Sequence, residues 1–322
     1  MTRKRTVAVT LATCLAVQMA SAQDFPSQPI TIVNPYSAGG PADLISRTVA
    51  ESMSKALGQP VVVENRPGAA TAIAAMHVAQ AEPDGYTLLI AGSPTHVITP
   101  ELQPDADYDG VADFAPVALV ATVPNVLVVP TSLGVTTAQE LADLAASEAD
   151  ALAFASVGNG SLPHLSSVLF MQETGSQMVH IPYGGAAPAV VDLLAGNVDM
   201  GFLNAPPLMS HIENGDLVAL GIASDERSEQ LPDTQTMEEL GFGNFQMSTW
   251  YGLSAPAGTS EDVIATLDEA VKTALDDADV REKLSSQGVM VTYRPSADFA
   301  AFLATDAERM LGLLDAAGVE GQ

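Results

Sequence analysis

Two glycine-containing turns that run directly into predicted helices are the parts of this sequence best suited to binding an anion. One turn spans residues 37–40, before a helix that starts near Ala42, and the other spans residues 160–162, before a helix near His164. The first turn of a helix carries unpaired N–H groups and partial positive charge, and glycine lets a ligand approach the backbone closely. The two turns therefore predict binding of an anion by backbone groups.

Side chains beside these turns add directed hydrogen bonds and one possible catalytic pair. The hydroxyls of Tyr36 and Ser161, and the ring of His164, can all contact a bound acid. Ser161 and His164 are also the residue types of a nucleophile and its base, but no third group that would orient the histidine is evident. We therefore expect no enzyme, with a hydrolase that uses Ser161 and His164 as a remote alternative.

Other catalytic and cofactor motifs are missing from the sequence. It has no Gly-x-Ser-x-Gly, Gly-x-x-x-x-Gly-Lys or His-Glu-x-x-His motif, and its five histidines lack the spacing of metal ligands. Asp105, Asp107 and Asp109 match the start of a calcium-binding loop, yet Pro116 stands where such a loop ends in glutamate. We expect no cofactor and no metal, and the calcium site stays open as a disfavoured alternative.

The charge balance excludes two classes of partner. The chain has 12 Lys and Arg residues against 39 Asp and Glu residues, for a formal net charge of −27. Nucleic acid and anionic membrane surfaces repel such a protein, so we expect neither as a partner. Salt screens the repulsion between its own carboxylates over about 8 Å or less. A marine or halophilic source is therefore a hypothesis that the composition supports.

The first 22 residues have the layout of a secretory signal peptide. Basic residues at positions 3–5 precede an apolar run at 6–19, which is short for a membrane span, and a small-residue cleavage site at 20–22. Cleavage before Gln23 predicts a periplasmic protein without cysteine, with nine basic residues against 39 acidic ones. Lipid attachment at Cys14 fits less well, because threonine precedes it.

The rest of the chain alternates apolar strands with helical patterns of about 10 to 16 residues. This alternation indicates βαβ units, an α/β fold and mainly parallel sheets. We predict one α/β domain from residues 23–122 plus 251–322 and a second from residues 123–250, with the chain crossing a hinge twice.

Three loops have the position of ligand loops in such a fold. Ligands of open α/β sheets lie beyond the carboxyl ends of the strands, where loops enter helices. The loops at residues 35–43, 156–164 and 182–188 have this position and are rich in Gly, Pro and Ser. We expect the ligand to lie among them.

Several short motifs occur in a fixed order along the chain. They are FPSQPI at 25–30, GGPAD at 39–43, VENRPGA at 63–69, PDGYTLL at 83–89, DFAPV at 113–117, GNGSLPHL at 158–165, VHIPY at 179–183, APA at 187–189 and SAPAGT at 254–259. In this order they resemble the tripartite tricarboxylate transporter receptor family, also called the Bug family. The resemblance covers essentially the whole chain after the signal peptide.

The resemblance implies a two-domain periplasmic binding protein of the Venus-flytrap kind (type II-like) with two hinge crossings. Such a receptor closes on a small organic acid and hands it to the membrane subunits of a transporter, and we expect it to be a monomer. A periplasmic sensor subunit that reports ligand occupancy to a signalling protein would have the same fold and cleft, so that alternative stays open.

Combining the loops with the resemblance gives the residues that we expect to contact the ligand. They are Tyr36, Ser37, Ala38, Gly39, Gly40, Asp43, Gly160, Ser161, His164, Tyr183, Gly184, Ala186 and Asn204. Gly184 stands where the family often has lysine, and Leu203 where it has aspartate. Tricarboxylates like citrate, C4 to C6 dicarboxylates, aromatic carboxylates and acidic amino acids all suit the resemblance. The missing aspartate disfavours an amino acid, because an ammonium group needs a carboxylate partner.

Overall fold

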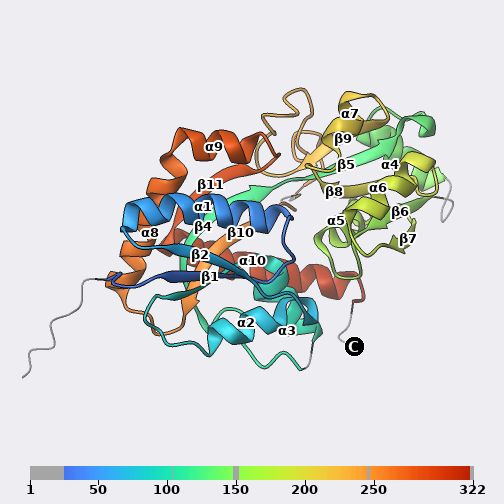
Figure 1. Cartoon of the computed structure of the whole chain (residues 1–322). Helices are drawn as coiled ribbons and strands as arrows, with labels where there is room; N and C mark the ends of the chain where they lie inside the picture. Colours follow the sequence, from blue (N-terminus) through green and yellow to red (C-terminus); the bar gives the residue numbers. More distant parts are fainter. Residues whose placement is uncertain (1–24, 104, 148–151, 244, 246, 320–322) are drawn as a thin grey trace, which may run out of the picture.

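The structure, a computed structural model, describes residues 25–103, 105–147, 152–243, 245 and 247–319. The predicted signal peptide and Cys14 lie outside these residues. The described chain forms two α/β lobes that lie side by side in Figure 1. No helix within the described ranges is both long enough and apolar enough to cross a membrane.

Lobe I is built on a six-stranded sheet whose strands lie in the order β11-β4-β10-β3-β1-β2. Its elements are β1 (Ile30–Asn34), α1 (Pro41–Leu57), β2 (Val61–Asn65), η1 (Ala69–Thr71), α2 (Ala72–Ala79), β3 (Thr87–Ala91), η2 (Pro94–Ile98), α3 (Thr99–Leu102), β4 (Phe114–Val123), β10 (Thr249–Pro256), α8 (Glu261–Asp276), α9 (Ala278–Ser285), β11 (Met290–Pro295) and α10 (Ser296–Ala316). Alternate residues of each strand face opposite sides. Ile30 and Ile32 pack under α1, α8 and α9, whereas Val33 packs against α2.

Lobe II is built on a five-stranded sheet in the order β7-β6-β8-β5-β9. Its elements are β5 (Asn125–Pro130), η3 (Thr131–Leu133), α4 (Ala138–Ser147), β6 (Ala153–Ser156), α5 (Leu162–Thr174), β7 (Val179–Pro182), α6 (Ala186–Ala195), β8 (Met200–Asn204), α7 (Met209–Glu213) and β9 (Leu217–Ala223). Leu127 and Phe202 face α4 and α5, and Val126 and Leu203 face α6.

The α/β class is as predicted, but the expectation of mainly parallel sheets is wrong. In lobe I only β1 pairs in parallel, with β2 and β3, while β10 and β11 run antiparallel to their neighbours. In lobe II β5 is antiparallel to both β8 and β9. Two of these strands, β5 and β10, are those by which the chain enters one lobe directly from the other, without a crossover helix.

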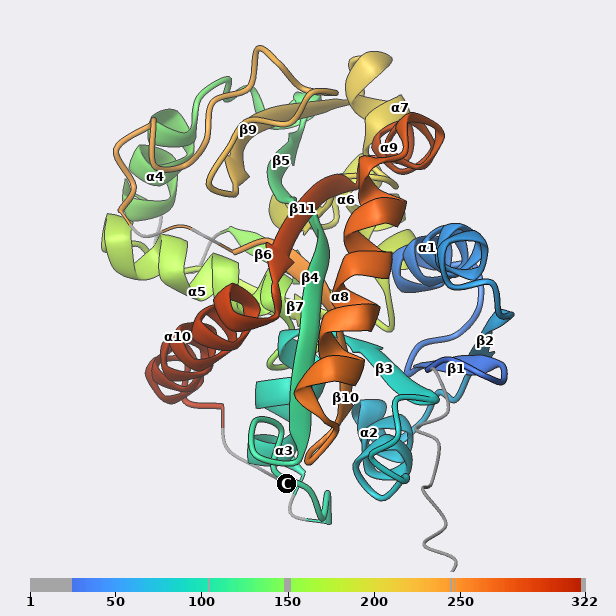
Figure 2. The same ribbon diagram turned by 90° about the vertical axis from the view of Figure 1, so that its left-hand side faces the viewer.

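The chain passes between the lobes at two neighbouring places. β4 ends at Val123 and β5 begins at Asn125, so Pro124 alone separates the two strands, and Figure 2 shows them following one another. The return passage leads into β10, which pairs with β4 from Thr249 onward. The strands of the two sheets thus come from different stretches of the chain, and the exact domain boundaries proposed above stay a prediction.

Helix α10 packs on both lobes. Phe299 and Leu303 near its start join Leu119 and Trp250 of lobe I, whereas Met310 and Leu314 near its end lie in the main core of lobe II. A helix of 21 residues is about 30 Å long, enough to reach from one lobe to the other. The C-terminal helix therefore adds a non-covalent link beside the two chain crossings.

An unusual backbone stretch precedes α2. Ala69, Ala70 and Thr71 have φ angles of 44°, 49° and 89°, in the left-handed region that residues with a Cβ seldom adopt. Holding an alanine there costs roughly 1–2 kcal/mol.

We predict that Ala70→Gly stabilises the protein by about 0.5–1 kcal/mol, because glycine relieves this strain although it makes the unfolded chain more flexible. The free energy of unfolding in urea is the measurement. The matched control is Ala265→Gly on the exposed face of α8, which should destabilise by about 1 kcal/mol. Equal destabilisation by the two substitutions would contradict the left-handed backbone at Ala70.

Candidate ligand-binding site

The first predicted ligand loop follows β1 and is held by hydrogen bonds within lobe I. The Tyr36 N–H donates to Asn34 Oδ1 at 3.0 Å, and Asn65 Nδ2 donates to the Tyr36 carbonyl at 3.0 Å. Gly39, at φ +90°, turns the chain into α1, where Pro41 occupies the start of the helix. Ser37 and Ala38 are exposed, and no described hydrogen bond uses their N–H groups.

Asp43 is used to fix this loop. Its Oδ2 accepts from the Gly39 N–H at 3.0 Å, and its Oδ1 accepts from Arg47 and from Asn65 Nδ2, each at 3.0 Å. The hydrogen bond from Arg47 holds the pKa of Asp43 below its usual value, against the effect of burial. Both oxygens are therefore engaged within lobe I, and a ligand contact by Asp43 stays a prediction.

Tyr36 lies at the base of the loop, edge-on to Tyr251 with 6.4 Å between the ring centroids. Burial raises the pKa of Tyr36 to about 12, and the neighbouring Thr95 side chain partly opposes the rise. The hydroxyl is therefore neutral at any working pH and can both donate and accept.

The second predicted turn starts α5 in lobe II. Ser161 is the N-cap residue: its Oγ accepts from the His164 N–H at 3.4 Å and donates to the Gly158 carbonyl at 2.6 Å. The Gly160 N–H donates to His164 Nδ1 at 3.1 Å. Ser161 thus bonds the backbone of His164 and not its ring, which is not the geometry of a nucleophile with its base.

His164 is kept neutral by its surroundings. Its ring stacks on His180 with centroids 4.0 Å apart, and Phe154 stacks on His180 at 4.8 Å. Burial, with a smaller effect from His180, lowers the pKa of His164 to about 4. Because Nδ1 accepts from Gly160, the neutral ring carries its proton on Nε2, where it can donate to a ligand. The sequence analysis missed His180, whose approach to His164 depends on the pairing of β6 with β7.

The third predicted loop joins β7 to α6. The Tyr183 hydroxyl donates to Asp192 Oδ2 at 2.6 Å, so this tyrosine is tied to α6. Gly184 is exposed, with open space around the position of a Cβ, and Ala186 is the first residue of α6. Ligand contacts by these three residues stay predictions.

Asn204 joins both chain crossings of the hinge. Its Nδ2 lies 3.1 Å from Asn125 Oδ1, at the start of β5, and 3.2 Å from Thr249 Oγ1, at the start of β10. Asn125, fully buried, donates in turn to the Met247 carbonyl at 2.6 Å. Asn204 is partly exposed, so it could contact a ligand while it is bonded to the hinge. The sequence predicted the ligand contact but not the hydrogen bonds to the hinge.

Asp105, Asp107 and Asp109 do not lie together as metal ligands, and no three acidic, histidine or cysteine side chains gather in this way in the described part of the chain. Asp109 instead accepts from the N–H groups of Val111 and Ala112, at 2.9 and 2.8 Å, and so closes a turn. Its pKa is lowered by these backbone hydrogen bonds.

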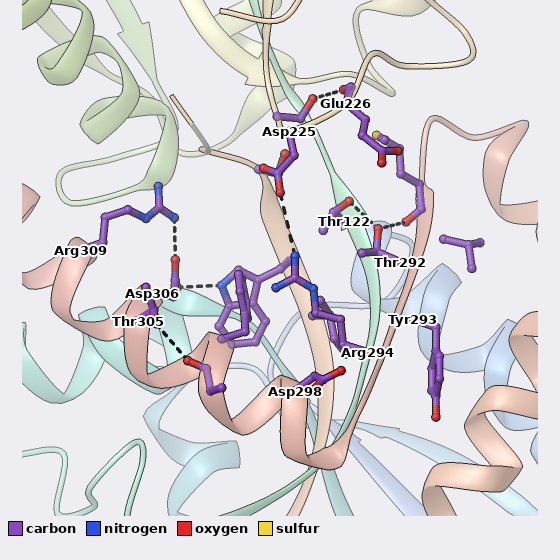
Figure 3. Close-up of a pocket in the computed structure, with 18 residues that line it drawn as sticks. Thr122, Asp225, Glu226, Thr292, Tyr293, Arg294, Asp298, Thr305, Asp306 and Arg309 are labelled. Carbon is purple, nitrogen blue, oxygen red and sulfur yellow. Dashed lines mark hydrogen bonds and ion pairs between the residues drawn. The ribbon is translucent and has the colours of Figure 1, made fainter. Parts of the chain in front are cut away.

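A cavity of about 700 Å³ lies on the hinge face, and none of the predicted ligand residues line it. Figure 3 shows Asp306 joined to Arg309, and Asp225 facing Arg294. Asp306 is 2 % exposed, and its Oδ2 accepts from Ser93 Oγ at 2.6 Å and from Trp250 Nε1 at 2.8 Å. This network fastens α10 to lobe I at the hinge.

Comparison with known proteins identifies the family. The sequence model of the tripartite tricarboxylate transporter family receptor matches residues 45–319. Protein BugT of Bordetella pertussis is 35 % identical over 315 residues, which cover 98 % of this chain and 97 % of that protein.

Two solved structures have the same fold. MatC from Rhodopseudomonas palustris with bound malate has a TM-score of 0.74 at 34 % identity, covering 90 % of this chain and 100 % of that one. An R. palustris protein with adipate has a TM-score of 0.80 at 30 % identity, covering 93 % and 100 %. These matches confirm the two-lobed periplasmic binding fold expected from the sequence. The chain belongs to the tripartite tricarboxylate transporter receptor family.

Proposed function

We propose that this chain is the extracytoplasmic receptor of a tripartite tricarboxylate-type transporter and binds a small organic carboxylate between its two lobes. The observation that carries the proposal is the pair of glycine turns at residues 37–40 and 160–162, each leading into a helix of 13 or more residues. The relatives with malate and adipate are dicarboxylate complexes, and they support a C4 to C6 dicarboxylate as the ligand.

Each carboxylate would be held mainly by neutral groups. The amides of Ser37 and Ala38, with the start of α1, offer donors and partial positive charge from lobe I. The start of α5 and the His164 Nε2–H offer donors and partial positive charge from lobe II. The Ser161 hydroxyl adds a donor to the ligand once it gives up its hydrogen bond to the Gly158 carbonyl. In the proposed complex these two helix starts face each other across the ligand, so they would select a ligand with an acid at each end, because a single carboxylate would satisfy only one lobe.

The cellular location and the partners that we propose follow from the family and from the predicted signal peptide. The signal peptide at residues 1–22 would deliver the chain to the periplasm, where it would act as a monomer and pass its ligand to the membrane subunits. We propose that it does no chemistry on the ligand. The hydrogen bonds of Ser161 to backbone groups support this, since its hydroxyl is not paired with the His164 ring.

A thermal-shift screen of organic acids tests the proposal. Malate, adipate, citrate, benzoate and glutamate should be compared at saturating concentration, and we expect a C4 to C6 dicarboxylate to give the largest rise in melting temperature. A hundredfold excess over the Kd stabilises the folded protein by about 2.7 kcal/mol. The neutral diamide of the same acid is the matched control and should give no shift. The proposal fails if no carboxylate raises the melting temperature.

The neutral state of His164 predicts how binding depends on pH. With the pKa of His164 at about 4, the ring stays uncharged from pH 6 to 8, so the Kd measured by calorimetry should change by less than about twofold. If His164 instead bound the acid as an imidazolium with an ordinary pKa of about 6.5, affinity would fall as pH rises through that value, by up to about tenfold per unit. Such a fall would contradict the neutral donor.

Replacing the ring tests the same contact directly. His164→Ala removes a hydrogen bond to a charged ligand and should weaken binding by about tenfold or more. His77→Ala, on the exposed face of α2, is the matched control and should leave the Kd unchanged.

A further inference from the structure

The short helical segment Pro94–Leu102, made of η2 and α3, leaves β3 of lobe I and reaches the core of lobe II. Val97 and Ile98 are 5 % and 8 % exposed and belong to the same apolar cluster as Phe154 and Phe170 of lobe II. We call this segment the bridge. It is separate from the two chain crossings of the hinge.

The first half of the bridge is anchored in lobe I, beside the first ligand loop. Thr95 is fully buried, its side chain neighbours the Tyr36 hydroxyl, and its carbonyl accepts from the Tyr108 hydroxyl at 2.6 Å. His96 Nδ1 lies 2.6 Å from the Gly110 carbonyl, and the His96 ring stacks on Trp250. This half therefore moves with lobe I.

The second half of the bridge packs against the second ligand turn. A Cβ placed on Gly160 would lie 2.9 Å from Leu102 Cδ1 and 3.7 Å from Ile98 Cγ2, so the ends of these two side chains lie close to the Gly160 backbone. Val319, beyond the end of α10, would lie at 3.7 Å from the same point. The Gly160 N–H that this packing fixes is the one that donates to His164 Nδ1.

The bridge thus connects the two halves of the ligand site by direct contacts. We propose that Leu102 and Ile98 are positioning residues of the receptor, which hold the Gly158–His164 turn in its ligand-binding shape from the opposite lobe. This inference rests on the proposed function for the ligand contact itself. Fixing a binding turn in advance lowers the ordering cost of binding.

A cavity lies beside both the turn and Leu102. The cavity, of about 470 Å³, is lined by Leu102, Asn159, His164 and Val319 among others. Shortening Leu102 would enlarge this space and remove an apolar contact of Gly160, so we expect the turn to open more often. The hydrogen bonds from the Gly160 N–H to His164 Nδ1 and from Ser161 Oγ to the Gly158 carbonyl would remain.

The test compares three variants of the full-length secreted protein: Leu102→Ala, Leu102→Met and Leu144→Ala. Methionine refills most of the lost volume, and Leu144 is a partly buried leucine of the same cluster on α4, so its loss is the matched control for general destabilisation. Hydrogen exchange of the ligand-free protein is followed in peptides covering residues 157–165, with the rest of α5 as the internal reference.

We expect Leu102→Ala to speed exchange at residues 157–165 by about tenfold relative to the rest of α5, with Leu102→Met near wild type and Leu144→Ala affecting both regions alike. The Kd for the dicarboxylate that gives the largest thermal shift should rise by about tenfold in Leu102→Ala and recover in Leu102→Met.

Two outcomes overturn the proposal. Unchanged exchange at the turn in Leu102→Ala would show that the bridge does not hold it. Faster exchange with an unchanged Kd would show that holding the turn does not position the ligand. If the wild-type protein binds no acid, the proposed function falls, while the exchange result still decides whether the bridge holds the turn.

Discussion

Scarcity of cationic side chains is the constraint on which this receptor's ligand site depends. Nine basic residues follow the predicted signal peptide, against 39 acidic residues. Eight of the nine lie within 4.0 Å of a carboxylate of the protein itself, so their charge is already balanced. Under the proposed mode of binding, the anion is stabilised by oriented backbone N–H groups, whose partial charge needs no counter-ion.

A site built from backbone turns, as we propose, requires those turns to be held accurately. A backbone N–H group moves only with its loop, whereas a lysine side chain is long and flexible. The loops must therefore already have the conformation that binds the ligand. Asp43 and Asn65 fix the first loop from within lobe I. The second turn is fixed by its own His164 and, across the lobes, by Leu102. Positioning therefore extends to residues that touch no ligand.

Local sequence signals predicted much of the fold. The helix that became α1 was readable because apolar residues recur at helical spacing and Gly58 ends it in a left-handed cap. The bridge was not readable, since its prolines and short length give no periodic pattern. β11 was not predicted either. The contact of α10 with both lobes could not be predicted, because periodicity shows that a helix has a buried face but not that its two ends pack on different lobes. Likewise, the sequence places Tyr183 in a loop after a strand, but its hydrogen bond to Asp192 depends on how α6 packs back toward that loop.

We propose that neutral backbone groups, and not basic side chains, bind the acid, and a crystal structure of the complex with the dicarboxylate that gives the largest thermal shift would test this. We expect one carboxylate at hydrogen-bond distance, about 2.7–3.1 Å, from amides of residues 37–40 and the other from amides of residues 160–164, with no Lys or Arg in contact. A ligand carboxylate paired with Arg294 or Arg309 in the hinge cavity, or with any other basic side chain, would contradict it.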